Sequence, residues 1–231
     1  MYTLLLRLGA PLQSWGSSSY YDKRGTDNMP TKSGVIGLLA AALGRRRDES
    51  LDDLNTLNFG VRIDQPGKRL NDFHVTDMGE KLNSNISTRT YLSDALFLVG
   101  LCSEDKLLLK ELSEAINNPK FPLFLGRRSC PPTQPINLGI RELALQDALQ
   151  EEPWLAAEPR RAKKQFGYNN EIRLRIITDA ESGAIKKDVP VSFSPYKREY
   201  RYRCIKEVPA KILKEIPAET FLEHDPMKEL G

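Results

Sequence analysis

The feature that most limits the possible folds is an uninterrupted apolar run, VIGLLAAAL, at residues 35–43. Thr31 or Ser33 precedes it as a candidate N-cap and Gly44 follows it as a candidate C-cap, so the run predicts a helix. A helix that is apolar on every side has to be packed on several sides. Glycines in its first half are expected where the helix lies close to a sheet, which indicates a fold that combines helices and strands.

The start of this helix, PTKSG, raises the question of a nucleotide-binding loop of the pattern G-x-x-x-x-G-K-[ST]. With Lys32 and Ser33 as the final pair, positions 26 and 31 would have to be glycine, and both are threonine. We therefore reject an NTPase. A lysine at a helix N-terminus still suits a phosphate, because free N–H groups and the positive end of the helix dipole point toward it. The alternative is that Ser33 only caps the helix and Lys32 is solvated.

The segments around this helix predict an alternating order of elements. Apolar runs bounded by glycine, proline and polar turns predict strands at YTLLLRLGAP (2–11), LNTLNFGVRID (54–64) and LSDALFLVGLC (92–102), and a short one within residues 121–139. A second amphipathic helix, with a serine cap, is predicted at residues 103–119. The order is β-α-β-β-α-β, the ferredoxin-like arrangement that RNA-recognition modules also use, so we expect an α+β domain over residues 1–140.

Two further regions surround or interrupt this pattern. Residues 68–91 form a long polar insert with few aliphatic side chains, and an insert of that kind inside a compact domain is usually functional or mobile. Residues 141–207 begin with a predicted helix and linker and continue with alternating strand patterns, which predict a small antiparallel β unit. Residues 208–231 are broken by prolines and are expected to form a tail.

Composition excludes several classes of protein. The chain has 231 residues and a net charge of only +3, so an anionic partner has to be met by local basic patches. Its three cysteines and two histidines are scattered, which argues against a disulfide framework or a zinc site and fits a reducing cytoplasm. The apolar amino terminus is interrupted by Arg7, and no long apolar span occurs, so neither a signal peptide nor a membrane helix is expected.

Four stretches, in this order, resemble the CasD family of CRISPR-associated proteins. They are RLGAPLQSWG (7–16), PTKSGVIGLLAAALG (30–44), TYLSDALFLVGL (90–101) and PLFLGRRSCPPTQPINLG (122–139). The resemblance implies a RAMP-superfamily subunit of the type I-E Cascade complex, with a ferredoxin-like domain and a thumb hairpin in the 68–91 insert. Such a subunit binds the 5′ handle of the CRISPR RNA and caps the backbone filament. It also supports the large PAM-reading subunit, so target DNA is a partner only indirectly, and it carries no cofactor.

Cationic and aromatic side chains in these stretches are the candidate RNA ligands. Aromatic rings interleaved with cations suit single-stranded RNA, because bases stack on the rings and the cations contact phosphates. The candidates are Tyr20, Lys23, Arg24, Lys32, Ser33, Arg89, Tyr91, Arg127, Arg128 and Ser129. Trp15 is expected to pack in the core. Adjacent side chains of an extended chain point in opposite directions, so one of Arg127 and Arg128 is expected to bind RNA and the other to anchor the fold.

An enzymatic alternative has to be considered, because in a related subtype the equivalent subunit is the ribonuclease that processes precursor CRISPR RNA. Metal-independent RNA cleavage needs a base for the 2′-hydroxyl and an acid for the leaving oxygen. His74 with Tyr91 and Lys32 could form such a set. No motif fixes a second proton donor beside His74, so the sequence favours a non-catalytic subunit.

Overall fold

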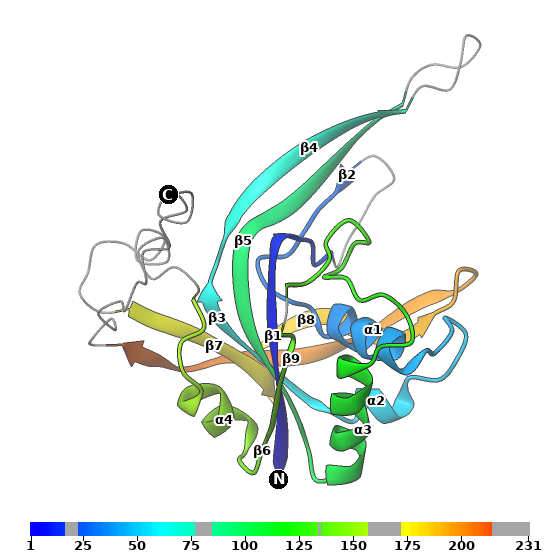
Figure 1. The fold of residues 1–231 in the computed structure, drawn as a ribbon. Coiled ribbons are helices and arrows are strands. Elements are labelled where there is room, and N and C mark those ends of the chain that lie inside the picture. The colour runs from blue at the N-terminus through cyan, green and yellow to red at the C-terminus, as the bar shows by residue number, and fades with distance from the viewer. Residues whose placement is uncertain (17–22, 77–84, 134, 157–171, 214–231) are drawn as a thin grey trace, which may run out of the picture.

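The protein is described by a computed structural model that covers residues 1–16, 23–76, 85–133, 135–156 and 172–213 (Figure 1). Within these residues the fold is α+β, with one nine-stranded, largely antiparallel sheet and few helices. The main path through the sheet is β6-β1-β5-β3-β7-β9-β8, and β2 and β4 also pair with β5. The strands are β1 Tyr2–Gln13, β2 Lys23–Arg24, β3 Asn58–Gln65, β4 Lys68–Thr76, β5 Asn85–Ser103, β6 Asn137–Arg141, β7 Ile172–Ala180, β8 Ala184–Phe193 and β9 Arg198–Leu213. The helices are α1 Lys32–Leu43, α2 Asp52–Asn55, α3 Lys106–Asn117 and α4 Leu145–Glu151.

The first strand is longer than its sequence predicts. We expected it to end at Gly9 and Pro11, whereas β1 continues to Gln13 and pairs with β5 throughout. Proline is tolerated because β6 pairs with β1 only between Thr3 and Leu6, so one side of β1 is free of a partner strand at Pro11. The predicted strand at residues 54–64 also differs, because its first residues belong to α2.

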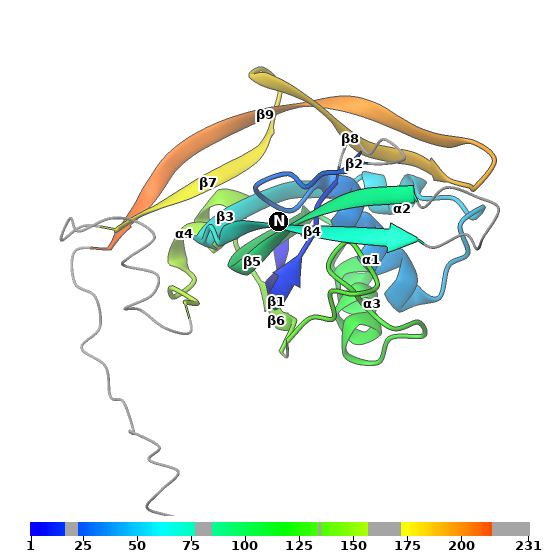
Figure 2. The ribbon, with the colours of Figure 1, turned by 90° about the horizontal axis from the view of Figure 1, so that it is seen from above.

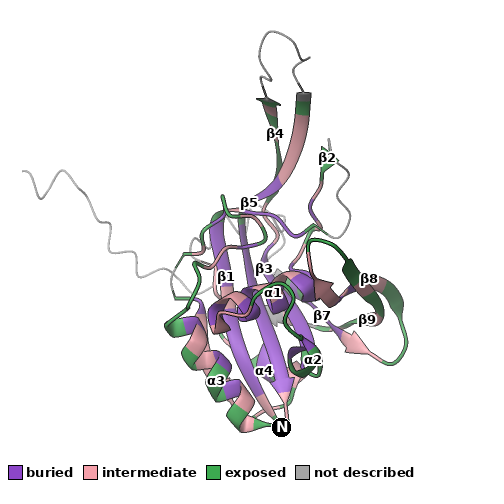
Figure 3. Ribbon diagram, turned by 90° about the vertical axis from the view of Figure 1, so that its right-hand side faces the viewer, coloured by how far each residue is buried: buried purple, intermediate pink, exposed green. Residues whose placement is uncertain are grey.

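Helices cover both faces of the central strands. Alternate residues of β1 point to opposite sides, so Leu4 and Leu6 join the main core with α1 and α3, whereas Leu5 packs with Leu149 of α4 on the other face. Figure 3 shows these central strands as mostly buried, the projecting part of β4 as mostly exposed and the projecting part of β5 as mostly intermediate. The core is therefore confined to the body of the sheet.

The caps of the two long helices follow local chemistry. Thr31 Oγ1 accepts a hydrogen bond from the backbone N–H of Gly34, and Gly44 ends α1 in the left-handed conformation at φ 80°. Both were predicted. The predicted serine cap of α3 is wrong, because the carboxylate of Asp105 accepts the N–H bonds of Leu107 and Leu108 instead. Aspartate and serine are comparable caps, so the sequence alone could not rank them.

The 68–91 insert forms part of a two-stranded hairpin. β4 pairs antiparallel with the first half of β5, from Lys68 opposite Ser93 to Thr76 opposite Asn85, and the hairpin projects from the body in Figure 1. The hairpin leaves the sheet at a bend marked by positive φ values at Gly67 and Asp94. A Cβ on Gly67 would lie 2.6 Å from the Ser93 carbonyl oxygen, so only glycine fits this bend.

The three C-terminal strands continue the same sheet. β7 pairs with β3 through Gly60, Val61 and Arg62, and β9 and β8 follow it, so the ribbon of β7, β8 and β9 arches over one side of the molecule (Figure 2). β9 extends to Leu213, past residue 208, where we expected a tail to begin. The rest of that predicted tail, 214–231, lies outside the described residues. The domain boundaries at 140 and 207 stay predictions.

Candidate nucleic-acid interface

The base of the hairpin gathers most of the candidate RNA ligands. The short strand β2 runs parallel to β5, with Lys23 opposite Thr88 and Arg24 opposite Arg89. We define the hairpin-base cluster by six residues that this pairing and the 126–130 turn bring together: Lys23, Arg24, Arg89, Tyr91, Arg127 and Ser129. Lys23 and Arg24 are exposed, and Arg89 is half-buried. Tyr20 lies outside the described residues.

The turn after Leu125 is held against the loop that follows β1. The N–H of Ser14 donates to the Leu125 carbonyl at 3.1 Å, and the N–H of Cys130 donates to the Arg127 carbonyl at 2.9 Å. Gly126 has φ +87°, and a Cβ there would lie 1.6 Å from the Ser14 carbonyl oxygen. As expected from the sequence, glycine permits a close backbone approach at this point. This close approach at Gly126 explains why the QSWG and LGRRS stretches lie together.

Arg127 is the anchoring arginine of the adjacent pair. Its Nη1 donates to the Thr90 carbonyl at 3.2 Å and its Nη2 to the Arg24 carbonyl at 2.6 Å. Its guanidinium also lies over the ring of Tyr91, 4.7 Å from the centroid. These contacts tie β2, β5 and the 126–130 turn to one side chain. The guanidinium of Arg128 makes no hydrogen bond to the described residues and is exposed, so it is the one available to a ligand.

Tyr91 and Ser129 form the floor of the cluster. The Tyr91 hydroxyl lies 3.5 Å from Ser129 Oγ, and the tyrosine is 4% exposed. Burial raises the pKa of Tyr91, but hydrogen bonds from Ser129, Arg127 and Arg89 and the positive charge of Arg127 outweigh burial and hold the pKa below its usual value. Beside them, Arg89 Nε is buried without a hydrogen-bond partner among the described residues. A buried donor of this kind requires an explanation, and an anionic ligand would supply one.

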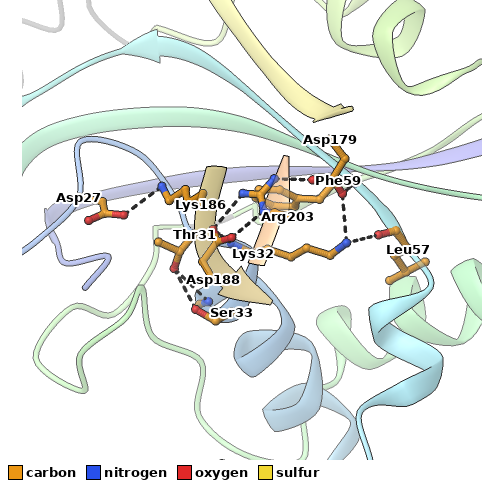
Figure 4. Close-up of polar contacts among 11 residues, drawn as sticks. Asp27, Thr31, Lys32, Ser33, Leu57, Phe59, Asp179, Lys186, Asp188 and Arg203 are labelled. Carbon is orange, nitrogen blue, oxygen red and sulfur yellow. Dashed lines mark hydrogen bonds and ion pairs between the residues drawn. The ribbon is translucent and has the colours of Figure 1, made fainter. Parts of the chain in front are cut away.

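Lys32 lies in the interior, away from the hairpin-base cluster. Its Nζ donates to the Leu57 carbonyl at 2.8 Å and to Asp179 Oδ2 at 3.1 Å, and the side chain is 7% exposed (Figure 4). Asp179 also binds Arg203 of β9, whose guanidinium lies over the ring of Phe59, 5.0 Å from the centroid. The Lys32 ammonium group is thus bound within the protein, and Lys32 is not among the phosphate ligands that we propose.

The anion position at the start of α1 is filled by the chain itself. The backbone N–H of Lys32 donates to Asp188 Oδ2 at 3.0 Å, and Arg203 donates to the same carboxylate at 2.6 and 2.9 Å (Figure 4). Burial raises the pKa of Asp188, but these hydrogen bonds and the charge of Arg203 outweigh it and lower that pKa. The sequence pointed to an RNA phosphate at this helix N-terminus, and it gave no sign that Asp188 of the same chain would lie there.

Ser33 and Arg128 line a groove along α1, with a volume of about 520 Å³. Ser33 is mostly buried, and its Oγ lies 3.4 Å from Thr31 Oγ1. The groove also contains residues that we did not predict as ligands, among them Arg46, Arg47 and Arg198. The sequence signals for them are the arginine run GRRR that follows α1 and the alternation KREYRYR at the start of β9.

The residues of the enzymatic alternative are separated. His74 lies on β4 against Asp72, opposite Ser87 of β5. Tyr91 is opposite Leu70, so along β4 the two are four residues, or about 13 Å, apart. Lys32 is held by Asp179. His74 and Tyr91 are thus too far apart along β4 to act together on one ribose and its phosphate, and the Lys32 ammonium is already bound inside the chain.

Two further features are absent from the described residues. None of the helices described here is long and apolar enough to cross a membrane. Likewise, over the described ranges no three histidine, cysteine, aspartate or glutamate side chains form a group that could hold a metal ion.

Comparison with known proteins now decides the family. The sequence model of the family described as "CRISPR-associated protein (Cas_Cas5)" matches residues 3–205, nearly the whole chain. The chain belongs to this family. It is also 38% identical to the CRISPR system Cascade subunit CasD of Escherichia coli (strain K12) over 156 residues, which cover 59% of this chain and 70% of that protein. The resemblance inferred from the four sequence stretches is thereby confirmed.

Solved structures agree with this membership. A chain of a structure described as "CRISPR RNA-guided surveillance complex" superposes with a TM-score of 0.75 and 32% identity, covering 90% of each chain. A second, described as "Crystal structure of Cas protein", superposes with a TM-score of 0.70 and 40% identity over 90% of this chain and 95% of the other. This family member therefore shares its overall fold with other CRISPR-associated proteins of known structure.

Proposed function

We propose that this chain is a non-catalytic subunit of a CRISPR RNA-guided surveillance complex and that it holds the 5′ handle of the CRISPR RNA. The observation that carries the proposal is the hairpin-base cluster, where cations surround a buried tyrosine. Arg89 Nε is a buried donor without a partner among the described residues there, and a phosphate oxygen would satisfy it. Lys23 and Arg24 of the cluster are exposed and add positive charge, and exposed Arg128 follows Arg127 in the adjoining turn.

The proposal includes the ferredoxin-like topology. The four strands of the first domain lie in the order β6-β1-β5-β3, so the first and third strands are central and the fourth and second flank them. α1 and α3 pack together on one face of these strands. Such an order supports a RAMP-type domain over residues 1–140, with the hairpin as its thumb and the β7–β9 ribbon as a separate addition.

The hairpin supports the proposed place in the complex. Phe73, Val75 and Ile86 lie on its exposed part and are 69%, 66% and 60% exposed. Val75 is directly opposite Ile86, and Phe73 lies two residues along β4, so all three point to the same face. An apolar face on a projecting hairpin fits contact with an adjacent backbone subunit. We further propose that the large PAM-reading subunit docks nearby, that target DNA is reached only through it, that no cofactor takes part, and that the complex is cytoplasmic.

The two arginines of the 126–130 turn provide the test. Arg128→Ala is expected to lower affinity for an RNA that begins with the repeat-derived handle by about tenfold, because a charged hydrogen bond is worth about 1.5–3 kcal/mol. It should also reduce the salt dependence by about one phosphate contact and leave the melting temperature unchanged. Arg127→Ala is expected to lower the melting temperature by several degrees, since it removes the bonds to Thr90 and Arg24.

The control is the same RNA with a scrambled handle. Equal affinity for the two RNAs would refute handle recognition, and so would an Arg128→Ala variant that binds like the wild type. Specific cleavage of repeat RNA in EDTA, lost in His74→Ala, would replace the proposal with the enzymatic alternative.

A further inference from the structure

The groove along α1 is separate from the hairpin-base cluster and has its own composition. Its floor is the side of α1 that carries the small residues Gly34, Gly37 and Ala41. One wall is the loop of residues 121–128, and the other is the end of the β8–β9 ribbon, at Phe193 and Tyr200. α1 has 12 residues, so the groove runs along a helix of about 18 Å.

Charge in this groove has a single sign. Five arginines line it, and no aspartate or glutamate is found among the lining residues. Arg45 is bound to Asp53 and to the Ser50 carbonyl, so it is occupied. The other four, Arg46, Arg47, Arg128 and Arg198, are exposed, and their guanidinium groups have no carboxylate partner among the described residues. Such an arrangement selects a polyanion.

Aromatic rings accompany the arginines. Phe121, Phe124, Phe193 and Tyr200 all line the groove, and Phe121 is 46% exposed. Rings beside guanidinium groups match the two parts of a single-stranded nucleic acid, since bases stack and phosphates pair with cations. An acidic peptide would use the arginines but would leave the rings without a specific role. The combination therefore favours single-stranded RNA.

The two ends of the groove differ in what they adjoin. Arg128 and Gly126 lie at the end next to Ser14 and the hairpin-base cluster, whereas Arg46 and Arg47 follow the C-terminus of α1. The backbone N–H of Phe121 donates to the Ala41 carbonyl, which fixes the loop along the helix between these ends. A strand that leaves the hairpin-base cluster past Arg128 would thus continue along α1.

We propose that the α1 groove is a second RNA site, which binds a single-stranded segment continuous with the handle and does so without regard to base sequence. This inference rests on the proposed function in one respect, which is that the bound RNA is the CRISPR RNA. Sequence tolerance follows from the lining at the Arg46–Arg47 end, where guanidinium groups and aromatic rings contact features that every nucleotide has.

The test measures the affinity of the full chain for two fluorescent probes, the handle RNA and an oligouridylate long enough to span α1, at several salt concentrations. The double variant Arg46→Ala, Arg47→Ala is expected to bind both probes about tenfold more weakly. For single strands the slope of log K against log salt should fall by about 0.7 for each phosphate that the variant can no longer neutralise. The control, Lys110→Ala with Lys206→Ala, removes two exposed positive charges outside the groove and should bind within about twofold of the wild type.

Stacking is tested at Phe121, which is exposed enough to be changed without altering the core. Phe121→Tyr keeps an aromatic face and should bind the oligouridylate like the wild type. Phe121→Leu keeps an apolar side chain but no ring, and should lose about fivefold or more, because base–aromatic stacking is worth about 1–3 kcal/mol.

Each outcome decides a different point. The inference is overturned if the double arginine variant binds RNA as tightly as its lysine control. In that case a preference for the handle RNA that depends on Arg128 would still support the proposed function. If the wild type binds handle and scrambled RNA equally while the arginine effect persists, the proposed function fails and the groove remains an RNA site. Competition by polyglutamate as strong as that by oligouridylate of equal charge, with no effect of Phe121→Leu, would overturn the assignment to RNA.

Discussion

Two glycines on one face of α1 are expected to respond to alanine with opposite changes in stability. At Gly37 a Cβ would meet only the ring of Phe193, at 3.5 and 3.6 Å, which is ordinary van der Waals contact. Alanine in a helix interior is favoured over glycine by about 1 kcal/mol. Gly37→Ala should therefore raise the free energy of unfolding by about 0.5–1 kcal/mol, and the melting temperature by about 1–4 °C, for a chain of this size.

At Gly34 the same methyl group has no room. Its Cβ would lie 2.8 Å from Trp15 Cε3 and 3.0 Å from Thr31 Oγ1. Trp15 is 1% exposed, and its Nε1 donates to Gln13 Oε1 at 3.0 Å, so the indole is held in place. Overpacking of a rigid core costs about 1–3 kcal/mol, which exceeds the gain in helix propensity. We expect Gly34→Ala to lower the free energy of unfolding by about 1 kcal/mol.

Urea unfolding followed by far-ultraviolet circular dichroism measures both changes. Dichroism is preferred to tryptophan fluorescence because Trp15 contacts one of the two substituted positions. The two variants control for each other, since they make the same substitution one helical turn apart. Equal m-values would show that both unfold from a native state of the same compactness. If Gly34→Ala is as stable as Gly37→Ala, then Trp15 adapts freely and the packing argument is refuted.

Two other perturbations follow from the structure. The Asp188 carboxyl has a lowered pKa in the folded chain, so its contribution to stability is full above the unfolded pKa of about 3.9 and is lost as pH falls through the folded value. The stability difference between wild type and Asp188→Asn should therefore be largest near neutral pH and shrink below about pH 4 in urea titrations; a difference that grows with acid would contradict this sign. On the hairpin, Phe73→Ser with Val75→Thr should change the free energy of unfolding by less than about 0.5 kcal/mol, because both side chains are exposed. The same variant should lose co-purification with the neighbouring backbone subunit, and undiminished co-purification would contradict the proposed thumb contact.

Local patterns were sufficient for most of the elements. The caps of α1 and the apolar run between them predicted that helix correctly, because a helix is specified by residues close in sequence. β7 was predicted from the alternation in EIRLRIITD, and β8 and β9 from DVPVSF and REYRYRCIKEV, although both of these strands are longer than the stretches that predicted them. The short helix α2 was missed, because Leu54 and Leu57 were assigned to the strand predicted at residues 54–64. The signal available in the sequence was the three-residue spacing of Leu51, Leu54 and Leu57.

Contacts between residues that are far apart in the sequence could not be predicted from the sequence alone. The sequence predicted that one of Arg127 and Arg128 would anchor the fold, but the choice depends on carbonyls that β2 and β5 supply. It placed Lys32 at a helix N-terminus that attracts an anion, but the partners, Asp179 and Asp188, are about 150 positions away in the chain. A lysine that seeks phosphate and one that seeks a buried carboxylate have the same local sequence, and only the tertiary fold separates them.

The buried ion network also holds one wall of the α1 groove, the end of the β8–β9 ribbon, in place. Asp188 and Arg203 belong to the β8–β9 ribbon, and their bonds to Lys32 and Asp179 attach that ribbon to the start of α1 (Figure 4). Phe193 lies at the end of β8 and lines the groove. Lys32 therefore helps to hold the groove wall in place but does not itself line the groove.

This position makes Lys32→Met a test of how the groove is held. Methionine fills a similar volume but leaves Asp179 without its ammonium partner, so we expect a loss of about 3 kcal/mol in the free energy of unfolding. RNA affinity should fall as well, because the ribbon that carries Phe193 is less firmly placed, but no phosphate contact is removed. The slope of log K against log salt should thus equal that of the wild type, whereas Arg128→Ala should flatten it. A flattened slope for Lys32→Met, measured by anisotropy on the folded variant, would mean that the ammonium reaches phosphate after all and that the buried arrangement does not persist in the bound state.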